Sequence, residues 1–231
     1  MIRWLGVAML VTLVALVAGF WLVGQQRAAA KTPSSSGSRH ALLLLLIWLA
    51  VPAAVAVSGW LHDFNARPPH FLMLLLPTTL ATTWLAFSRH GRRLVEGIQI
   101  GWLIGFQLFR LPLEWLLHRL YQENIVPVQM TFAGRNFDIV TGTLALCLLW
   151  WSRRVRLPRW AIWGFNLVGL ALLINIVTIA LLSAPLPIRR FFNEPANTFI
   201  AEWPWVWLPM FLVQAAWFGH LLVFRWLRQR R

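Results

Sequence analysis

Long apolar segments alternate with short polar and basic segments along nearly the whole chain. A helix needs about 20 predominantly apolar residues to cross the hydrocarbon core of a membrane, and most of these segments approach that length. The pattern therefore predicts an all-α fold, a polytopic transmembrane helical bundle of about seven spans. We expect the spans at residues 4–24, 41–60, 71–88, 97–118, 137–152, 160–183 and 204–226.

The polar segments divide the chain into three parts. Residues 1–24 are expected to form a first transmembrane anchor, and the small polar residues of 25–40 a flexible cytoplasmic linker. Residues 41–231 are expected to form a six-helix transmembrane core with outer loops at 119–136 and 184–203. The second of these loops is rich in polar and aromatic residues, so it is expected to be either a lid or a plain interfacial loop.

The first span begins with the short basic stretch MIRWLG, a start that is also typical of a signal peptide. Its apolar stretch of about 20 residues is longer than the roughly 7–15 apolar residues of a cleaved signal. A retained anchor is therefore favoured, with cleavage of this span as the alternative.

Basic residues are concentrated in alternate loops. The loops after the first, third and fifth spans, together with the C-terminal end, hold more than twice as many Lys and Arg residues as the remaining loops. Positive residues are retained on the cytoplasmic side, so we expect the N-terminus outside and the C-terminus inside. The acidic residues agree with this orientation, because only Glu96 falls toward the inner side.

The formal net charge of +14 could indicate a nucleic-acid-binding protein. However, 59% of the chain is apolar, and the basic residues form short clusters between apolar segments. Membrane topology explains this charge better, so no nucleic acid is expected as a partner. The expected partners are membrane lipids, with anionic lipid at the basic cytoplasmic face, and a further membrane protein is an alternative.

The fourth span carries a row of polar side chains. At 100° per residue, one helix face about 100° wide holds Gln99, Gln107, Arg110, Glu114, His118 and Tyr121. A charge at bilayer depth costs several kcal/mol unless it is paired or hydrated, so this face should turn toward the other helices. Arg110 and Glu114 are four residues apart and are expected to pair along the helix. Pro112 lies between them and predicts a kink.

Other polar residues are expected at the same depth as this row. Together they predict a pocket that opens to the outside and holds a ligand. No metal site is expected. The candidate ligand-binding residues are Arg110, Glu114, His118, Arg135, Asn136, Asp138, Asn175 and Gln214. The structural alternative is a set of interhelical hydrogen bonds and one buried ion pair that fix the packing.

Several other kinds of chemistry are disfavoured, and no cofactor is expected. His220 is a lone histidine in the seventh span, which favours a packing role, and no second histidine lies at a matching depth for haem. The single lysine, Lys31, lies in a loop, which excludes a retinal Schiff base. The single cysteine, Cys147, excludes an internal disulfide and a cysteine-based metal cluster. The chain also lacks a phosphate-cradling glycine motif.

The stretches GRNFDIVTGTLAL and FNEPANTFIAEWPWVWLPMFLVQAAWFGHLL resemble a family of small uncharacterised bacterial polytopic inner-membrane proteins. The resemblance covers about the C-terminal half of the chain, from Arg110 onward. It implies a multi-pass protein of the bacterial inner (cytoplasmic) membrane, and it implies no catalytic or binding residues.

Three functions remain open at this stage. The leading hypothesis is an integral membrane protein that holds a polar or amphiphilic ligand in an outer-leaflet pocket. The enzymatic alternative is an intramembrane hydrolase or transferase acting on a lipid-like substrate, with His118 or Glu114 as general base and Ser58 or Thr141 as nucleophile. The third is a structural subunit of a membrane complex. A transporter is less favoured, because no internal repeat is detectable.

Overall fold

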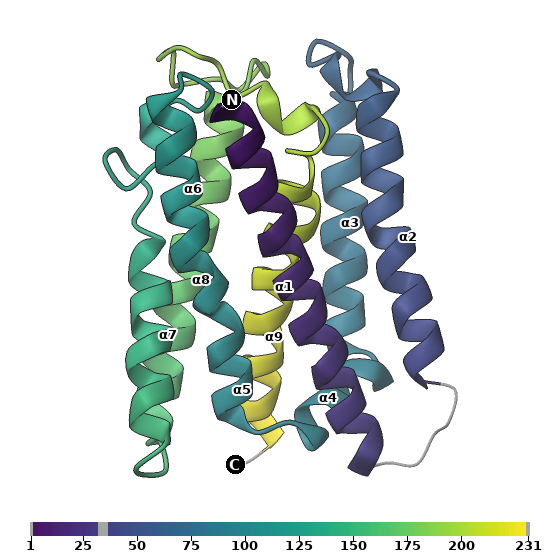
Figure 1. Ribbon diagram of the computed structural model, residues 1–231, viewed down its shortest axis with the longest axis vertical. Helices are drawn as coiled ribbons and strands as arrows, with labels where there is room; N and C mark the ends of the chain where they lie inside the picture. Colours follow the sequence, from purple (N-terminus) through teal and green to yellow (C-terminus); the bar gives the residue numbers. More distant parts are fainter. Residues whose placement is uncertain (1, 32–36, 230–231) are drawn as a thin grey trace.

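The computed structural model describes residues 2–31 and 37–229, and all regular structure within them is helical. This confirms the all-α class. Most of the helices run alongside one another in an elongated bundle, with the two ends of the chain at opposite ends of the bundle (Figure 1). The α-helices are α1 (Ile2–Lys31), α2 (Gly37–Val57), α3 (His70–Phe87), α4 (Arg89–Gly97), α5 (Ile100–Gly105), α6 (Arg110–Gln122), α7 (Ile139–Ser152), α8 (Arg159–Ser183) and α9 (Val213–Gln229).

Five helical segments are long and apolar enough to cross a membrane, which indicates a membrane protein. Two further apolar stretches are shorter, at Ala41–Val57 of α2 and Ile139–Ser152 of α7. The membrane-length segments are Trp4–Ala30, His70–Phe87, Ile100–Gln122, Arg159–Ser183 and Leu208–Gln229.

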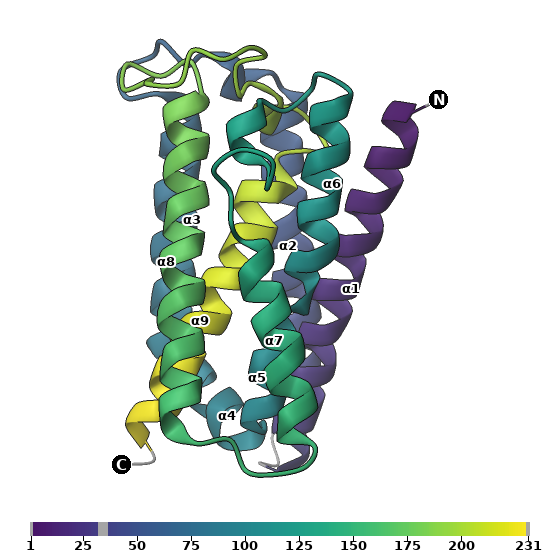
Figure 2. The same ribbon diagram turned by 90° about the vertical axis from the view of Figure 1, so that its left-hand side faces the viewer.

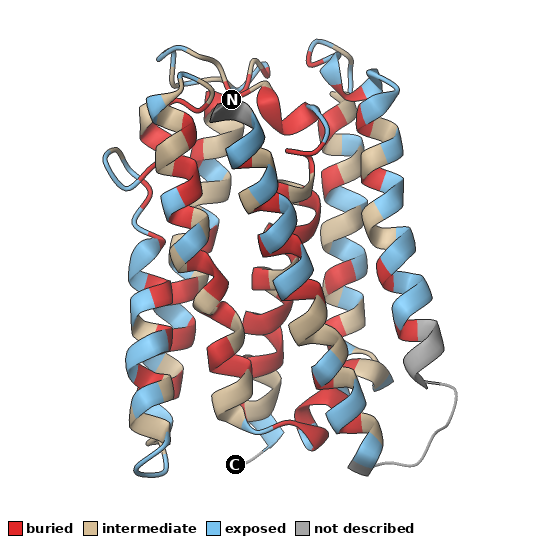
Figure 3. Cartoon of the chain, in the orientation of Figure 1, coloured by how far each residue is buried: buried red, intermediate tan, exposed pale blue. Residues whose placement is uncertain are grey.

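The last helix is at the centre of the bundle. In the segment Leu208–Gln229, 72% of the most apolar window is buried, whereas for α3 the value is 22%. Figure 3 shows buried residues concentrated along α9 and along α5 and α6, while the outward faces of α2, α3 and α7 are largely exposed. These outward faces carry large apolar side chains such as Leu76, Leu80 and Leu146, as expected for helices in contact with lipid.

The linker predicted at residues 25–40 is shorter in the structure, because α1 continues to Lys31 and α2 begins at Gly37. Residues 32–36 lie outside the described residues. The extension of α1 has two physical reasons. Its sequence, QQRAAAK, consists of good helix formers, and Ala28 is buried against Gly97 of α4.

The fourth predicted span is divided in two. Helix α5 passes into a 3₁₀ turn at Phe106–Phe109, and α6 begins at Arg110. Proline at position 112 cannot donate to the carbonyl of residue 108, and its ring crowds that carbonyl. The tighter 3₁₀ geometry accommodates this constraint, so the distortion lies just before Pro112.

The basic loops gather at one end of the bundle. Helix α4, the loop between α7 and α8 and the C-terminal part of α9 all lie at that end (Figure 2). The segments 123–138 and 184–207 lie toward the opposite end, near the start of α1. The two groups of loops therefore lie at opposite ends of the bundle.

The segment between α8 and α9 folds back over the bundle. Asn197 donates a hydrogen bond to the carbonyl of Ala180 at 2.8 Å, and Phe199 and Ile200 are buried. At its exposed tip, Arg189 donates to Glu194 at 3.0 Å, and this hydrogen bond holds the pKa of Glu194 below its usual range. The segment therefore covers the interior of the bundle.

The close approach of α1 and α4 gives a testable prediction. A Cβ atom at Gly97 would lie 2.5 Å from the Cα of Ala28, a backbone atom that cannot move aside alone. We expect Gly97→Ala to lower the free energy of unfolding in mixed micelles by about 1–3 kcal/mol. The control is Gly164→Ala on α8, where a Cβ would meet no atom within 4 Å. Equal stability of the two variants would contradict this packing.

Candidate ligand-binding site

A buried ion pair joins the fourth span to α7. Arg110 is the first residue of α6, and its Nη1 lies 2.6 Å from Oδ1 of Asp138, the residue just before α7. Both side chains are almost fully buried, with 1% and 4% of their surface exposed. Because an unpaired charge is costly in such surroundings, each residue stabilises the other in the bundle interior.

Two further contacts extend this ion pair to a third helix. Thr141 in α7 donates to the same Asp138 oxygen at 3.0 Å. Arg110 also donates through Nη1 to the carbonyl of Gly169 in α8, at 3.2 Å. The guanidinium therefore ties α6, α7 and α8 together.

Glu114, one turn after Arg110, has a different partner from the one predicted. Its two carboxylate oxygens each accept from Nδ2 of Asn136 at 2.8 Å, whereas the ion pair of Arg110 is with Asp138. Asn136 in turn accepts from the backbone N–H of Asp138 at 3.1 Å. Asn136 thus bridges the two acidic residues, and the guanidinium points across to the neighbouring helices instead of along its own.

The loop before α7 brings these groups to the site. Helix α7 begins part of the way down the bundle, below the level at which α6 and α8 end (Figures 1 and 2). The backbone N–H of Asn136 donates to the carbonyl of Thr131, so this irregular segment keeps its hydrogen bonds inside the protein. Gly134 is required here because a Cβ would collide with the carbonyl oxygen of Val128.

His220 in α9 approaches the same cluster. Its Nδ1 is 2.9 Å from Oδ1 of Asn166, whose Nδ2 donates to the backbone carbonyl of His220. A Cβ at Gly169 would lie 2.5 Å from Cε1 of the imidazole, so the ring and Arg110 both approach this glycine. These contacts agree with the packing role predicted for His220. Its partner Asn166 shares one face of α8 with Gly169, and a polar and a small residue on one face are typical of close helix contacts.

A cavity of about 80 Å³ adjoins the ion pair. Its wall is apolar apart from Arg110, Glu114 and Asp138, and Phe199 and Ile200 contribute to it from the covering segment. Nε and Nη2 of Arg110 are buried and have no hydrogen-bond partner in the structure. The cavity can hold a few water molecules or one small ligand, so unused donors and space for an acceptor occur together.

Four of the predicted site residues lie elsewhere. His118 stacks on Phe132 with ring centroids 4.3 Å apart. The other three residues and their contacts are Arg135, over the ring of Phe191; Asn175, donating to the carbonyl of Arg135; and Gln214, donating to Thr79. The structure therefore brings together Arg110, Glu114, Asn136 and Asp138, and it separates them from His118, Arg135, Asn175 and Gln214.

The groups considered for catalysis are not arranged around a free nucleophile. The hydroxyl of Ser58 donates to the carbonyl of Val55 on its own helix, and the hydroxyl of Thr141 donates to Asp138. No group of three His, Cys, Asp or Glu side chains in the described part of the chain could hold a metal ion.

One comparison with known proteins gives a match. A family model described as a domain of unknown function (DUF8737) matches residues 68–228. The matched region begins just before α3 and includes the whole buried cluster, while α1 and α2 lie outside it. No curated protein and no solved structure matches the chain.

The ion pair gives a second prediction. Removing one partner leaves a buried charge unpaired, so Arg110→Met or Asp138→Asn should each lower the free energy of unfolding by about 3–5 kcal/mol. The double variant should lose much less than the sum of the two. Unfolding in mixed micelles measures this cycle. The control is the exposed pair Arg92 and Glu96, 3.8 Å apart, whose coupling should stay below about 0.5 kcal/mol. Equal coupling in both pairs would contradict the assignment.

Proposed function

The chain belongs to the family described as a domain of unknown function (DUF8737), and we propose that it is an integral membrane protein whose outer half binds a small polar ligand against Arg110. The observation that carries this proposal is the pair of unused donors, Nε and Nη2, on a buried guanidinium in the wall of a cavity. Buried donors are nearly always satisfied, by protein, water or ligand.

The membrane arrangement is part of the proposal. All seven predicted segments cross the bilayer of a bacterial inner membrane, with α2 and α7 as the shorter spans. The N-terminus is outside, and the basic loops face the cytoplasm. The gathering of the basic loops at one end of the bundle supports this orientation, because cytoplasmic loops are enriched in Lys and Arg.

The chemistry of the cavity restricts the ligand. A guanidinium with two donor nitrogens free, Nε and Nη2, favours planar acceptor groups such as a carboxylate. The nearby carboxylates of Glu114 and Asp138 disfavour a ligand with a large negative charge. The volume of about 80 Å³ admits a few heavy atoms and no complete lipid tail. A small carboxylate such as formate or acetate fits these limits best.

The cluster lies in the outer half of the proposed bundle, beneath the segment 184–207. This segment would have to move for a ligand to enter, because Phe199 and Ile200 are buried and line the cavity. The predicted lid role for this loop is therefore retained in the proposal. The enzymatic alternative has less support, because the hydroxyl of Thr141 is already engaged with Asp138.

The proposal predicts a stabilising effect of small carboxylates. Sodium formate and sodium acetate should raise the melting temperature of the purified protein above that in sodium gluconate at equal ionic strength, since gluconate is too large for the cavity. Ala180→Leu, which fills the cavity from α8, should abolish the difference. Ala171→Leu, on the exposed face of the same helix, is the matched control.

Two results would contradict this function. The first is a melting temperature of the wild-type protein that is the same in all three salts. The second is an equal rise in Ala180→Leu and in the wild type, which would place the carboxylate effect outside the cavity.

A further inference from the structure

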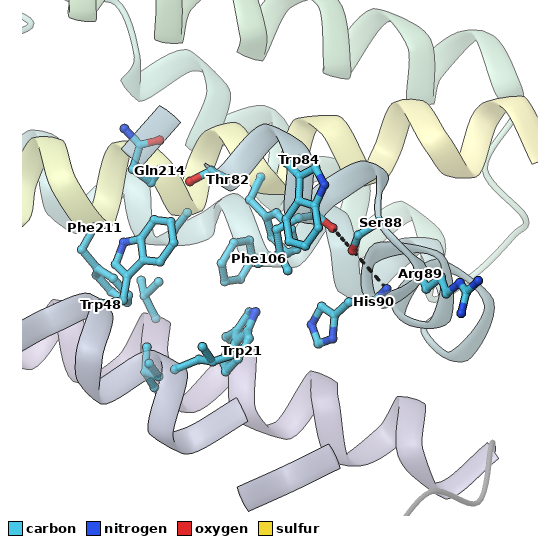
Figure 4. Close-up of a pocket in the computed structure, with 16 residues that line it drawn as sticks. Trp21, Trp48, Thr82, Trp84, Ser88, Arg89, His90, Phe106, Phe211 and Gln214 are labelled. Carbon is cyan, nitrogen blue, oxygen red and sulfur yellow. Dashed lines mark hydrogen bonds between the residues drawn. The ribbon is translucent and has the colours of Figure 1, made fainter. Parts of the chain in front are cut away.

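A second and much larger crevice lies away from the Arg110 cluster. Its volume is about 620 Å³, and its walls come from α1, α2, α3, the start of α4 and α9, with Phe106 and Phe211 completing the lining. Figure 4 shows Trp48 and Phe211 toward one end of the crevice and Ser88, Arg89 and His90 at the other. The crevice is therefore elongated, with one aromatic end and one polar end.

The crevice exists because of how α2 is held. Helix α2 packs against α1 and against the helical turn Leu208–Leu212, which leads into α9. The indole of Trp48 donates to the carbonyl of Met210 at 2.9 Å, and the indole of Trp207 donates to the carbonyl of Leu49 at 3.0 Å. These bonds fix α2 near its middle, and the space beside α3 is left for side chains such as Leu45 and Trp84 to line.

The interior of the crevice offers little for a polar ligand. Most of its wall is aliphatic or aromatic. Gln214 is the main polar group in the middle. Its Nε2 is engaged with Thr79 and with the carbonyl of Pro209, so only its Oε1 is left without a hydrogen-bond partner in the described part of the chain. Such a wall suits a flexible apolar chain, and the volume is within the range of roughly 300–1,000 Å³ that is common for ligand sites.

The polar end of the crevice is basic. Ser88 caps α4 by accepting from the backbone N–H of His90, which directs the first residues of α4 across the mouth. The side chain of Arg89 is exposed and has no hydrogen bond or ion pair with the part of the chain that the structure describes. Arg225 donates to the carbonyls of Ala86 and Ser88 at 2.8 Å, so a second cation lies beside the first.

His90 adds no charge to this mouth near neutral pH. Burial, and next the positive charge of Arg93, lower the pKa of His90 from its usual value. The neutral ring lies 2.7 Å from Nε2 of Gln25 in α1, which can donate to it. The positive charge at the mouth therefore comes from arginines alone, and it persists at all physiological pH values.

We propose that this crevice binds one acyl chain of an anionic membrane lipid, with Arg89 holding the lipid head group. The apolar wall of the crevice suits the acyl tail of such a lipid. The positive charge of Arg89 at its polar end suits the phosphate of the head group. The proposal is independent of the carboxylate site, because α1 and α2 contribute to the crevice and not to the Arg110 cavity.

The proposal predicts one tight and selective lipid-binding event. Native mass spectrometry of the purified full chain in detergent, titrated with dioleoylphosphatidylglycerol, should resolve a first binding step at least fivefold tighter than the following steps. Dioleoylphosphatidylcholine should bind at least fivefold more weakly at that step, because its head group carries no net negative charge.

Two variants and two matched controls test the site. Arg89→Gln removes the head-group contact, and Ala215→Leu fills the crevice from α9; each should weaken the first step at least fivefold. The controls are Arg156→Gln, an exposed arginine in the loop between α7 and α8, and Ala171→Leu on the exposed face of α8. Both should bind like the wild type.

Each other outcome overturns the proposal. If phosphatidylcholine binds as tightly as phosphatidylglycerol, the site is not selective for an anionic lipid. If Arg89→Gln weakens binding and Ala215→Leu does not, the lipid is held by surface charge and not in the crevice. If Arg156→Gln weakens binding as much as Arg89→Gln does, binding depends on the overall positive charge of this end of the bundle and not on Arg89.

Discussion

The fold depends on the need to pair a charge that lies inside an apolar bundle. Arg110 is buried among helices with mainly apolar side chains. Its burial is energetically tolerable because its Nη1 forms an ion pair with Oδ1 of Asp138 at 2.6 Å. To supply that carboxylate, the loop before α7 descends into the bundle, and α7 is correspondingly short. The carbonyl of Gly169 completes the contact from α8. One ion pair thereby fixes the relative positions of three helices.

The same constraint explains the rest of the polar cluster. Once the loop has carried Asp138 to this depth, Asn136 comes with it and reaches Glu114. The close approach of α8 and α9 at Gly169 brings His220 against the cluster. The space that these contacts leave under the segment 184–207 is small, and the larger crevice lies where α2 is held away from α3. The two cavities therefore have different origins, one from a polar cluster and one from the placement of a peripheral helix.

Hydrophobic periodicity was sufficient to predict the helical class and the inward direction of the charged row. Gln107, Arg110 and Glu114 are all buried, because a helix face that carries charges cannot lie against lipid. The partner of Arg110 could not be predicted, since spacing along one helix favours Glu114 and gives no information about side chains on α7. The partner of His220, Asn166, could not be predicted for the same reason, because the two residues are distant in the sequence.

Other differences between the predictions and the structure have causes that composition does not reveal. The predicted linker at 25–40 is helical up to Lys31 because Ala28 packs on Gly97, a contact between distant segments. Gln214 and Asn175 were grouped with the site by depth alone, yet depth does not determine which helix face a side chain occupies. The span count of about seven and the orientation across the membrane remain predictions.

The most direct test of the central claim is a high-resolution density map of the protein in lipid nanodiscs. The account predicts the guanidinium of Arg110 within hydrogen-bonding distance of Asp138, enclosed by α6, α7 and α8 and out of contact with acyl chains. A map in which Arg110 and Glu114 face the lipid, or in which Asp138 lies in the head-group region apart from Arg110, would contradict it.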